Sequence, residues 1–181
     1  MREMSLHIMD VAENGIGAGA SLIEIRVTED RQANRLTIGI KDNGRGIPAD
    51  LLDKVTDPFY TTRTTRRVGL GLSLFREASR RCEGEFGIQS KEREGTEVSA
   101  SFRLDHIDLA PMGDMVGTLI SLIVGNPQVD FLYTHEVGGR VFKLDTREVK
   151  QELDGVEITR PEVITFLGDL IRQSLAEIRK G

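Results

Sequence analysis

Two short segments near the beginning of the chain carry residues whose types and spacing could do chemistry. Asp42 is followed at two-residue intervals by Gly44 and Gly46. A carboxylate that accepts hydrogen bonds therefore stands beside backbone that can turn sharply or that a ligand can approach closely. Asp10 and Asn14 are four residues apart. On a helix this spacing points two oxygen ligands the same way, which suits a hard cation and a water molecule.

A third segment, Gly69-Leu70-Gly71, opens an amphipathic stretch that we expect to be helical. Glycines at a helix start expose backbone N–H groups, and a helix N-terminus favours phosphate. Residues 56–68, which precede it, have no clean period and contain three arginines and five threonines. We expect them to form a mobile loop.

A helix over residues 5–15 would position the first pair of candidate ligands. It ends in glycines at 15, 17 and 19, which are typical of a helix end. Its expected core stripe is Ile8, Met9, Ala12 and Ile16, and its second stripe is His7, Asp10 and Asn14. The second stripe contains none of the Lys, Arg or Glu residues that usually fill exposed helix positions, so a solvated face does not explain it well.

Alternating apolar residues predict the strands that would carry Asp42 and its neighbours. Residues 21–29 and 35–41 read as an antiparallel pair, a short helix follows over 49–55, and two more strands are expected near 85–90 and 97–104. The helix that Gly71 opens is expected to bury Leu74, Phe75, Ala78 and Cys82.

The character of the chain changes from residue 105. We expect a linker at 108–111, a helix over 113–124, a hairpin of 129–134 and 140–144 that turns at Gly138-Gly139, a short helix over 146–153, and a last helix. Thr159 to Glu162 reads as a capping box for that last helix. Its apolar stripe is Val163, Leu167, Leu170, Ile171, Leu175 and Ile178. The hairpin either completes the sheet or packs beside it.

Composition and charge restrict the function. The 181 residues are 39% hydrophobic and 29% charged, which is ordinary for a soluble globular protein. Residues 1–104 hold 16 basic and 16 acidic side chains, whereas 105–181 hold 8 and 13 and carry the whole net charge of −5. This acidic half argues against a nucleic-acid surface there. The longest apolar run is too short to cross a bilayer, and the lone Cys82 fits a reducing compartment, so we expect a cytoplasmic protein.

Taken together and in this order, the three segments resemble the GHKL superfamily of ATP-binding domains, over roughly residues 5–104. Residues 12–20 resemble the first helix and loop of the mismatch-repair branch, and residues 57–63 with 69–73 resemble the lid of bacterial histidine kinases. The resemblance implies an α/β sandwich in which one mixed sheet is backed by helices. It leaves residues 105–181 as an α+β appendage, which could bind a partner or form a dimer.

The resemblance also implies a role for each matching residue. Asn14 would coordinate Mg²⁺ on the triphosphate, and Asp42 would accept a hydrogen bond from the adenine amino group with help from Thr96. Arg63 would reach the phosphates and Phe59 would anchor the lid. The remaining expected contacts are Gly44, Gly46 and Ile47 beside the purine, and Gly69, Leu70 and Gly71 around the phosphates.

Three departures from the family pattern bear on the reaction. Asp10 stands where ATPase branches usually have a glutamate that activates water and where histidine kinases usually have asparagine, which leaves slow hydrolysis open. Arg67 replaces the first glycine of the kinase-type lid motif. No phosphoacceptor hairpin precedes the first helix in this sequence, so kinase activity would need a separate phosphoacceptor protein.

We therefore expect Mg²⁺-dependent ATP binding, with slow hydrolysis or phosphoryl transfer to a separate protein. The alternative is a non-catalytic, ATP-gated interaction module of the kind found among anti-sigma factors. A remote alternative is a dinucleotide-binding protein, because Gly44-x-Gly46-x-x-Ala49 follows a strand. We expect a protein partner or a second copy of the chain, and no nucleic acid or membrane. His7 is expected beside the site or half-buried, His106 in a linker and His135 in a turn; no His/Cys cluster has zinc spacing.

Overall fold

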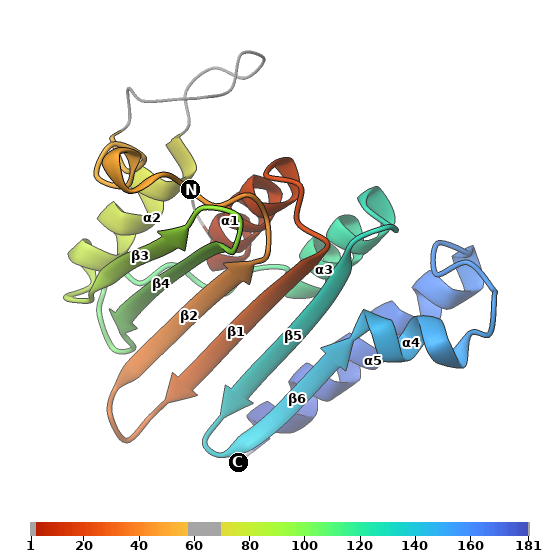
Figure 1. The fold of residues 1–181 in the computed structure, drawn as a ribbon. Coiled ribbons are helices and arrows are strands. Elements are labelled where there is room, and N and C mark those ends of the chain that lie inside the picture. Colours follow the sequence, from red (N-terminus) through yellow and green to blue (C-terminus); the bar gives the residue numbers. More distant parts are fainter. Residues whose placement is uncertain (1–2, 58–69, 181) are drawn as a thin grey trace.

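The computed structural model describes residues 3–57 and 70–180, and within them the strands form one six-stranded sheet in the order β3-β4-β2-β1-β5-β6 (Figure 1). Neighbouring strands are antiparallel except β1 and β5, which are parallel, so the sheet is mixed. The elements are α1 (Met4–Gly17), β1 (Leu22–Asp30), β2 (Arg35–Asp42), the 3₁₀ helix η1 (Ala49–Leu51), α2 (Leu70–Arg81), β3 (Phe86–Lys91), β4 (Gly95–Arg103), α3 (Met115–Gly125), β5 (Asp130–Val137), β6 (Arg140–Asp145), α4 (Thr146–Glu152) and α5 (Pro161–Arg179).

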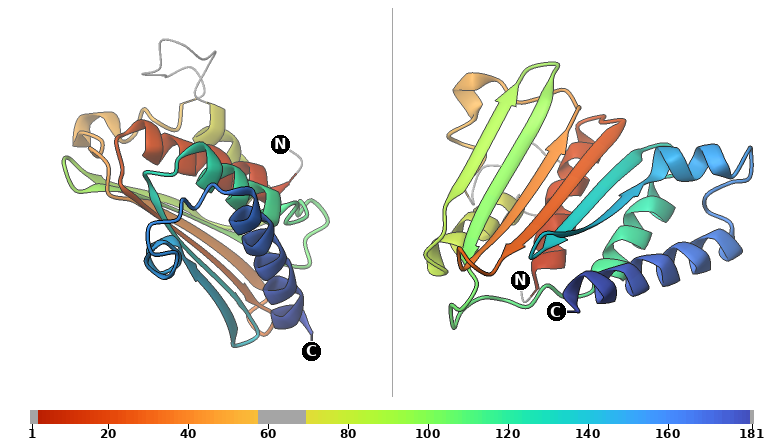
Figure 2. Two further views of the ribbon diagram at one scale, coloured as in Figure 1. Left: turned by 90° about the vertical axis from the view of Figure 1, so that its right-hand side faces the viewer. Right: turned by 90° about the horizontal axis from the view of Figure 1, so that it is seen from below.

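The helices α1, α2, α3 and α5 cover one face of this sheet (Figure 2). Alternate side chains of the strands point into that layer, as a half-buried strand requires. Examples are Ile23, Ile25 and Val27 on β1, all of which are buried. An α/β sandwich with one mixed sheet backed by helices, as the sequence indicated, is therefore the observed fold.

The predicted buried face of α2 is partly wrong. Leu74 is 37% exposed, whereas Phe75, Ser79 and Cys82 are buried. These three residues repeat at steps of four and three, so they form the stripe that faces the sheet. Leu74 lies about 100° around the helix from Phe75, because one residue advances the helix by that angle. The missed position is Ser79, whose hydroxyl donates to the carbonyl of Ser101 on β4 at 2.9 Å.

The hairpin of β5 and β6 completes the sheet rather than packing beside it. β5 pairs in parallel with β1 over its whole length, from Leu22 opposite Asp130 to Glu29 opposite Val137. The helix α3 packs against both α1 and α5. The apolar stripes of residues 105–180 are therefore buried against each other and against the shared helical layer. The division at residue 104 stays a prediction.

Two local predictions in this region are wrong. Thr159 does not cap α5: the N-cap is Arg160, with no side-chain hydrogen bond, and Pro161 is the first helical residue. A residue that precedes proline is held extended, so the helix begins at the proline. His135 lies in β5 rather than in a turn and is completely buried, because pairing with β1 extends the strand to Val137.

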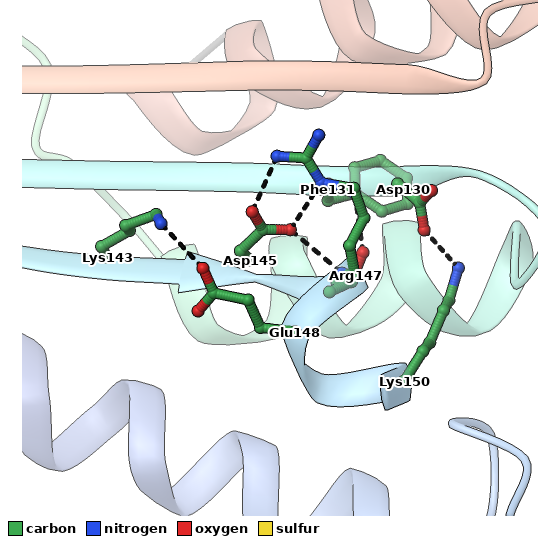
Figure 3. Close-up of polar contacts among 8 residues, drawn as sticks. Asp130, Phe131, Lys143, Asp145, Arg147, Glu148 and Lys150 are labelled. Atoms are coloured by element: carbon green, nitrogen blue, oxygen red, sulfur yellow. Dashed lines mark hydrogen bonds and ion pairs between the residues drawn. The ribbon is translucent and has the colours of Figure 1, made fainter. Parts of the chain in front are cut away.

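The short helix α4 is fixed to the sheet by polar contacts at the ends of β5 and β6 (Figure 3). Asp145 accepts hydrogen bonds from the backbone N–H of Arg147 at 3.0 Å and from its guanidinium at 2.9 and 2.7 Å. Lys150 reaches the carboxylate of Asp130 at 2.7 Å. The hydroxyl of Thr146 accepts from the N–H of Phe131 at 2.8 Å. Charged groups here neutralise one another.

Across residues 3–57 and 70–180, no helix is both long enough and apolar enough to span a membrane.

Candidate functional site

A polar row ends the apolar, helix-covered face of the sheet. Asp42 on β2 lies directly opposite Thr96 on β4, and Thr96 lies directly opposite Ser90 on β3. We call Asp42, Thr96 and Ser90 the polar row. Side chains of directly opposed residues lie on the same face of the sheet. On each of the three strands, the next residue on that face, two positions further into the sheet, is apolar. The polar row therefore replaces one layer of the core at the end of the sheet where β2 stops and β4 begins.

The Asp42 carboxylate is held in place by backbone donors. Its Oδ1 accepts from the N–H of Gly44 at 2.8 Å, and the backbone N–H of Thr96 also donates to it. Partial burial raises the pKa of Asp42 above its ordinary value, and these two hydrogen bonds oppose that rise. A desolvated, fixed carboxylate of this kind gains from a ligand that donates a hydrogen bond to it.

The two glycines after Asp42 are required by the protein's own packing. A Cβ on Gly44 would lie 2.9 Å from both Cβ and the carbonyl oxygen of Ala18. Gly46 has a φ of +70°, and a Cβ there would lie 2.0 Å from the carbonyl oxygen of Lys91. Both positions therefore need glycine whether or not a ligand is bound. The expectation that a purine approaches this backbone stays a prediction.

The helix α1 brings its candidate ligands to the same end of the sheet. A Cβ on Gly15 would lie 2.7 Å from the Cβ of Asp42, so the C-terminal turn of α1 rests on the polar row. Asp10 and Asn14 precede Gly15 on the helix, and both are partly buried. Five residues of helix span about 7.5 Å, so Asp10 lies one to two turns away from Asp42 along α1.

The first turn of α2 meets α1 at Asp10. A Cβ on Gly71 would lie 3.2 Å from both Cβ and Oδ2 of Asp10, so the start of α2 is in contact with this carboxylate. Backbone N–H groups at a helix start carry partial positive charge. An anion held by that helix start would therefore sit beside Asp10. Leu70, the first residue of α2, is exposed at this point.

His7 lies deeper in the α1–α2 interface than expected. It is 2% exposed, its ring stacks on that of Phe75 with centroids 5.1 Å apart, and its Nδ1 has no hydrogen-bond partner among the residues that the structure describes. Burial lowers the pKa of His7 to about 4. The imidazole is therefore neutral at pH 7 and acts as a core side chain.

The described residues bring together Asp10, Asn14, Asp42, Gly71 and Thr96 at one end of the sheet. Ile47 also reaches this end, where its N–H donates to the hydroxyl of Ser90 at 2.8 Å. Phe59, Arg63 and Gly69 lie outside the described residues. Sequence reasoning missed Ser90. The alternation Phe86, Ile88, Ser90 could have revealed it, because a polar residue there occupies a core-face position.

The fold bears on two other kinds of site, a dinucleotide site and a metal cluster. Both neighbours of β2 are antiparallel to it, whereas a dinucleotide fingerprint needs a strand–helix–strand unit with parallel strands, so that alternative is excluded. In residues 3–57 and 70–180, no three His, Cys, Asp or Glu side chains are grouped to hold a metal ion. Any cation at Asn14 would need further ligands from a bound molecule or from water.

A cavity of about 210 Å³ lies at the opposite end of the strands, among the β1–β2 turn, the α2–β3 loop and the end of β4. Two arginines line it, and one of them, Arg103, is paired with Glu83 and Asp105. Because these charges are paired within the protein, we assign the functional site to the polar row and not to this cavity.

Comparison with known proteins identifies the family of the chain. Residues 3–106 match the family model described as histidine kinase-, DNA gyrase B-, and HSP90-like ATPase. The sensor protein kinase WalK of Staphylococcus haemolyticus (strain JCSC1435) is 36% identical over 95 residues, which are 50% of this chain and 16% of that protein. WalK of Staphylococcus epidermidis (strain ATCC 12228 / FDA PCI 1200) is 38% identical over 85 residues, 44% of this chain and 14% of that protein. This chain thus matches only a small part of these relatives.

Two solved structures share the fold at 16% sequence identity. The N-terminal domain of a DNA repair protein has a TM-score of 0.57, with 80% of this chain and 53% of that chain covered. The Aquifex aeolicus MutL ATPase domain, complexed with ADP, has a TM-score of 0.55, with 85% and 68% covered. The family model spans more than half of the chain and contains every described residue of the site. The chain belongs to the family of histidine kinase-, DNA gyrase B-, and HSP90-like ATPases.

Proposed function

We propose that this protein binds ATP together with Mg²⁺, with the adenine at the polar row and the phosphates between α1 and the start of α2. Turnover is slow hydrolysis or phosphoryl transfer to a separate protein. The observation that carries the proposal is the contact between Gly71 and Asp10 on a helix that also rests on Asp42. The helix α1 thereby connects the Asp42 carboxylate, which could accept from a purine, to the N-terminus of α2, which could bind phosphate.

Adenine recognition follows from the chemistry of Asp42. Its carboxylate is fixed by Gly44 and Thr96, and burial leaves it short of the solvation an ionised group needs. An exocyclic amino group would donate to it and restore part of that stabilisation. The ADP in the MutL ATPase domain is consistent with an adenine nucleotide in a domain of this fold.

The donor set on α1 fits a magnesium ion that is shared with the nucleotide. Asn14 offers an amide oxygen one turn from the Asp10 carboxylate, and Mg²⁺ is usually held by one or two protein groups plus phosphates and water. Bound Mg²⁺ would neutralise charge on the triphosphate. Asp10 can hold a water molecule near the phosphates and accept its proton.

Asp42→Asn tests the adenine assignment. The amide presents an N–H toward the donor of the purine, so we expect ATP to bind about 2–3 kcal/mol more weakly, the cost of an unsatisfied buried group. Asp50→Asn, at an exposed position of η1, is the matched control and should bind like the wild type. Calorimetric titration measures both. Equal affinity of the wild type for ATP and GTP would contradict the assignment.

A product assay separates the three modes of action: free phosphate, a phosphorylated protein, or neither despite tight binding. If Asp10 is the general base, Asp10→Asn should lower phosphate release about 10²–10⁴-fold and leave ATP binding intact. An unchanged rate would exclude that role. Asn14→Ala should remove much of the magnesium-dependent part of the affinity for ATP; an unchanged magnesium response would make Asn14 structural.

A further inference from the structure

Ser90 lies at the outer end of the polar row and joins three segments through one hydroxyl. Its Oγ accepts from the N–H of Ile47 at 2.8 Å, donates to the carbonyl oxygen of Gly95 at 2.8 Å, and lies 2.8 Å from the Oγ1 of Thr96. It therefore ties the loop after Asp42 to the turn between β3 and β4. It also contacts the hydroxyl of Thr96, the residue directly opposite Asp42.

The number of protons fixes the direction of the contact between the two hydroxyls. A serine hydroxyl has one proton and two lone pairs. A carbonyl oxygen can only accept, so the proton of Ser90 goes to Gly95. One lone pair receives the N–H of Ile47, and the other is left for Thr96. The Thr96 hydroxyl must then donate its own proton to Ser90.

Toward a ligand beside Asp42, Thr96 would therefore present only its remaining lone pairs, which accept hydrogen bonds. An ionised carboxylate also accepts only. The two groups together form an edge of acceptors, and a molecule bound there must present donors to it. A group that only accepts, such as a carbonyl oxygen on the purine ring, would leave buried acceptors facing one another, which costs affinity.

We propose that Ser90 is a positioning residue for nucleotide selectivity: by engaging the Thr96 proton it makes the polar row select a 6-amino purine over a 6-oxo purine. This inference rests on the proposed function, because it concerns the same site. It goes beyond that function by naming the group that sets the hydrogen-bond polarity of Thr96. Ser90 itself need not touch the nucleotide.

The test compares the affinities of the full chain for ATP and ITP. ATP has an amino donor at position 6 and an acceptor at N1, whereas ITP has a carbonyl acceptor at position 6 and an N–H donor at N1. Titrations with Mg²⁺ present give the ratio of the two dissociation constants. In Ser90→Ala the Thr96 proton is released and can turn toward an oxygen at position 6. We expect the preference for ATP to fall roughly five- to tenfold, the range for one hydrogen bond. Ser90→Thr keeps the hydroxyl and should keep the wild-type ratio.

The double variant separates positioning from support of the loop. If Ser90 acts through the Thr96 hydroxyl, Ser90→Ala should not change the ratio when Thr96 is already valine. If Ser90 only anchors Ile47, Ser90→Ala should weaken ATP and ITP by the same factor in both backgrounds, and that result would overturn the inference.

Thr96→Val alone gives a second test that does not depend on the folding of Ser90→Ala. With Thr96 as an acceptor, its loss should weaken ATP more than ITP. A greater loss for ITP would show that Thr96 donates to the ligand, and the inference would fail. A wild type that binds neither nucleotide at millimolar concentration would instead overturn the proposed function, so the two failures are distinguishable.

Discussion

The two buried histidines show how differently two regions of one sheet treat polar groups. His7, between α1 and α2, has an Nδ1 with no hydrogen-bond partner within the described part of the chain, and burial holds its pKa at about 4. His135, on β5, is bonded on both nitrogens: Nδ1 to the hydroxyl of Tyr133 at 2.7 Å and Nε2 to Glu29 at 2.8 Å. Both rings are almost completely buried. Among the described residues, the α1–α2 region therefore leaves a ring nitrogen of its buried histidine unbonded, whereas the β5 region bonds both ring nitrogens.

The carboxylates follow the same division. In the first region, burial raises the pKa of Asp42. Where β5 and β6 join the sheet, hydrogen bonds outweigh the effect of burial. The bond from His135 lowers the pKa of Glu29, and the bonds from Arg147 lower the pKa of Asp145. Polar groups around α4 and β5 therefore serve to hold the structure together. Those beside α1 are stabilised less by the protein itself, which is the condition under which a ligand contributes most.

The largest expected effect tests whether the two regions unfold together. Phe75 and Tyr133 are both completely buried, one in each region. We expect Phe75→Ala and Tyr133→Ala each to lower the free energy of unfolding by about 3–5 kcal/mol in a single transition, because the regions share one sheet. Urea unfolding followed by circular dichroism measures this, with the exposed Phe166→Ala as the control. If amide hydrogens in β2 stay protected from exchange under conditions in which those in β5 exchange freely, the two regions unfold separately.

The next prediction concerns the unpaired histidine. The unfolded chain takes up a proton on His7 near pH 6.5, whereas the folded protein resists it down to about pH 4. The contribution of neutral His7 to stability is therefore complete above pH 6.5 and is lost as the pH is lowered to 4, by about 3 kcal/mol in total. His7→Phe should remove this loss. The difference in unfolding free energy between the variant and the wild type should grow across that range.

His106→Gln, at a histidine in the linker, is the matched control for this measurement. A difference between His7→Phe and the wild type that stays constant from pH 7 to pH 4 would contradict the assignment of His7 as a neutral core residue. It would also remove the contrast with His135.

A smaller effect is expected in the paired region. Asp145 caps α4 and binds the guanidinium of Arg147, so Asp145→Ala should cost about 1–2 kcal/mol at pH 7. Asp145→Asn keeps the cap and should cost less. Because the folded pKa of Asp145 is depressed, this contribution is present above pH 3.8 and is lost as the pH falls through the folded pKa.

The control for this third prediction is Asp169→Ala, which breaks an exposed pair with Arg172 on α5. Its effect should be about 0.5 kcal/mol or less, because exposed ion pairs are screened by water. Equal costs for Asp145→Ala and Asp169→Ala, measured by urea unfolding, would show that the contacts of α4 contribute little to stability.

Local patterns in the sequence predicted most of the elements, and the resemblance to the GHKL superfamily implied that Asp10, Asp42 and Thr96 share one site. Alternation and helical spacing are properties of a few neighbouring residues, so they can be read directly from the chain. The partner of a strand is not a local property. Nothing near Asp130–Val137 indicates that it lies beside Leu22–Asp30. For that reason the burial of His135 was missed, and the sequence left open whether the hairpin completes the sheet or packs beside it.

Ser90 was missed for a related reason. Its position on the core face of β3 is visible in the sequence, but its importance depends on Thr96 and on the N–H of Ile47, which come from other segments. Hydrogen-bond networks join residues that are close only after folding. The sequence therefore predicted the acceptor Asp42, which a motif marks, and overlooked the hydroxyl that acts on its neighbour.

The parallel pairing of β1 with β5 also has a consequence for how the chain is made. Glu29 and His135 are 106 residues apart in sequence, yet they bond across this pair. During synthesis one edge of β1 therefore stays unpaired until β5 has left the ribosome. Contacts of such long range slow folding, and an unpaired apolar edge is open to other chains in the meantime. For this protein, nascent chains that stop short of β5 are the species most exposed to aggregation.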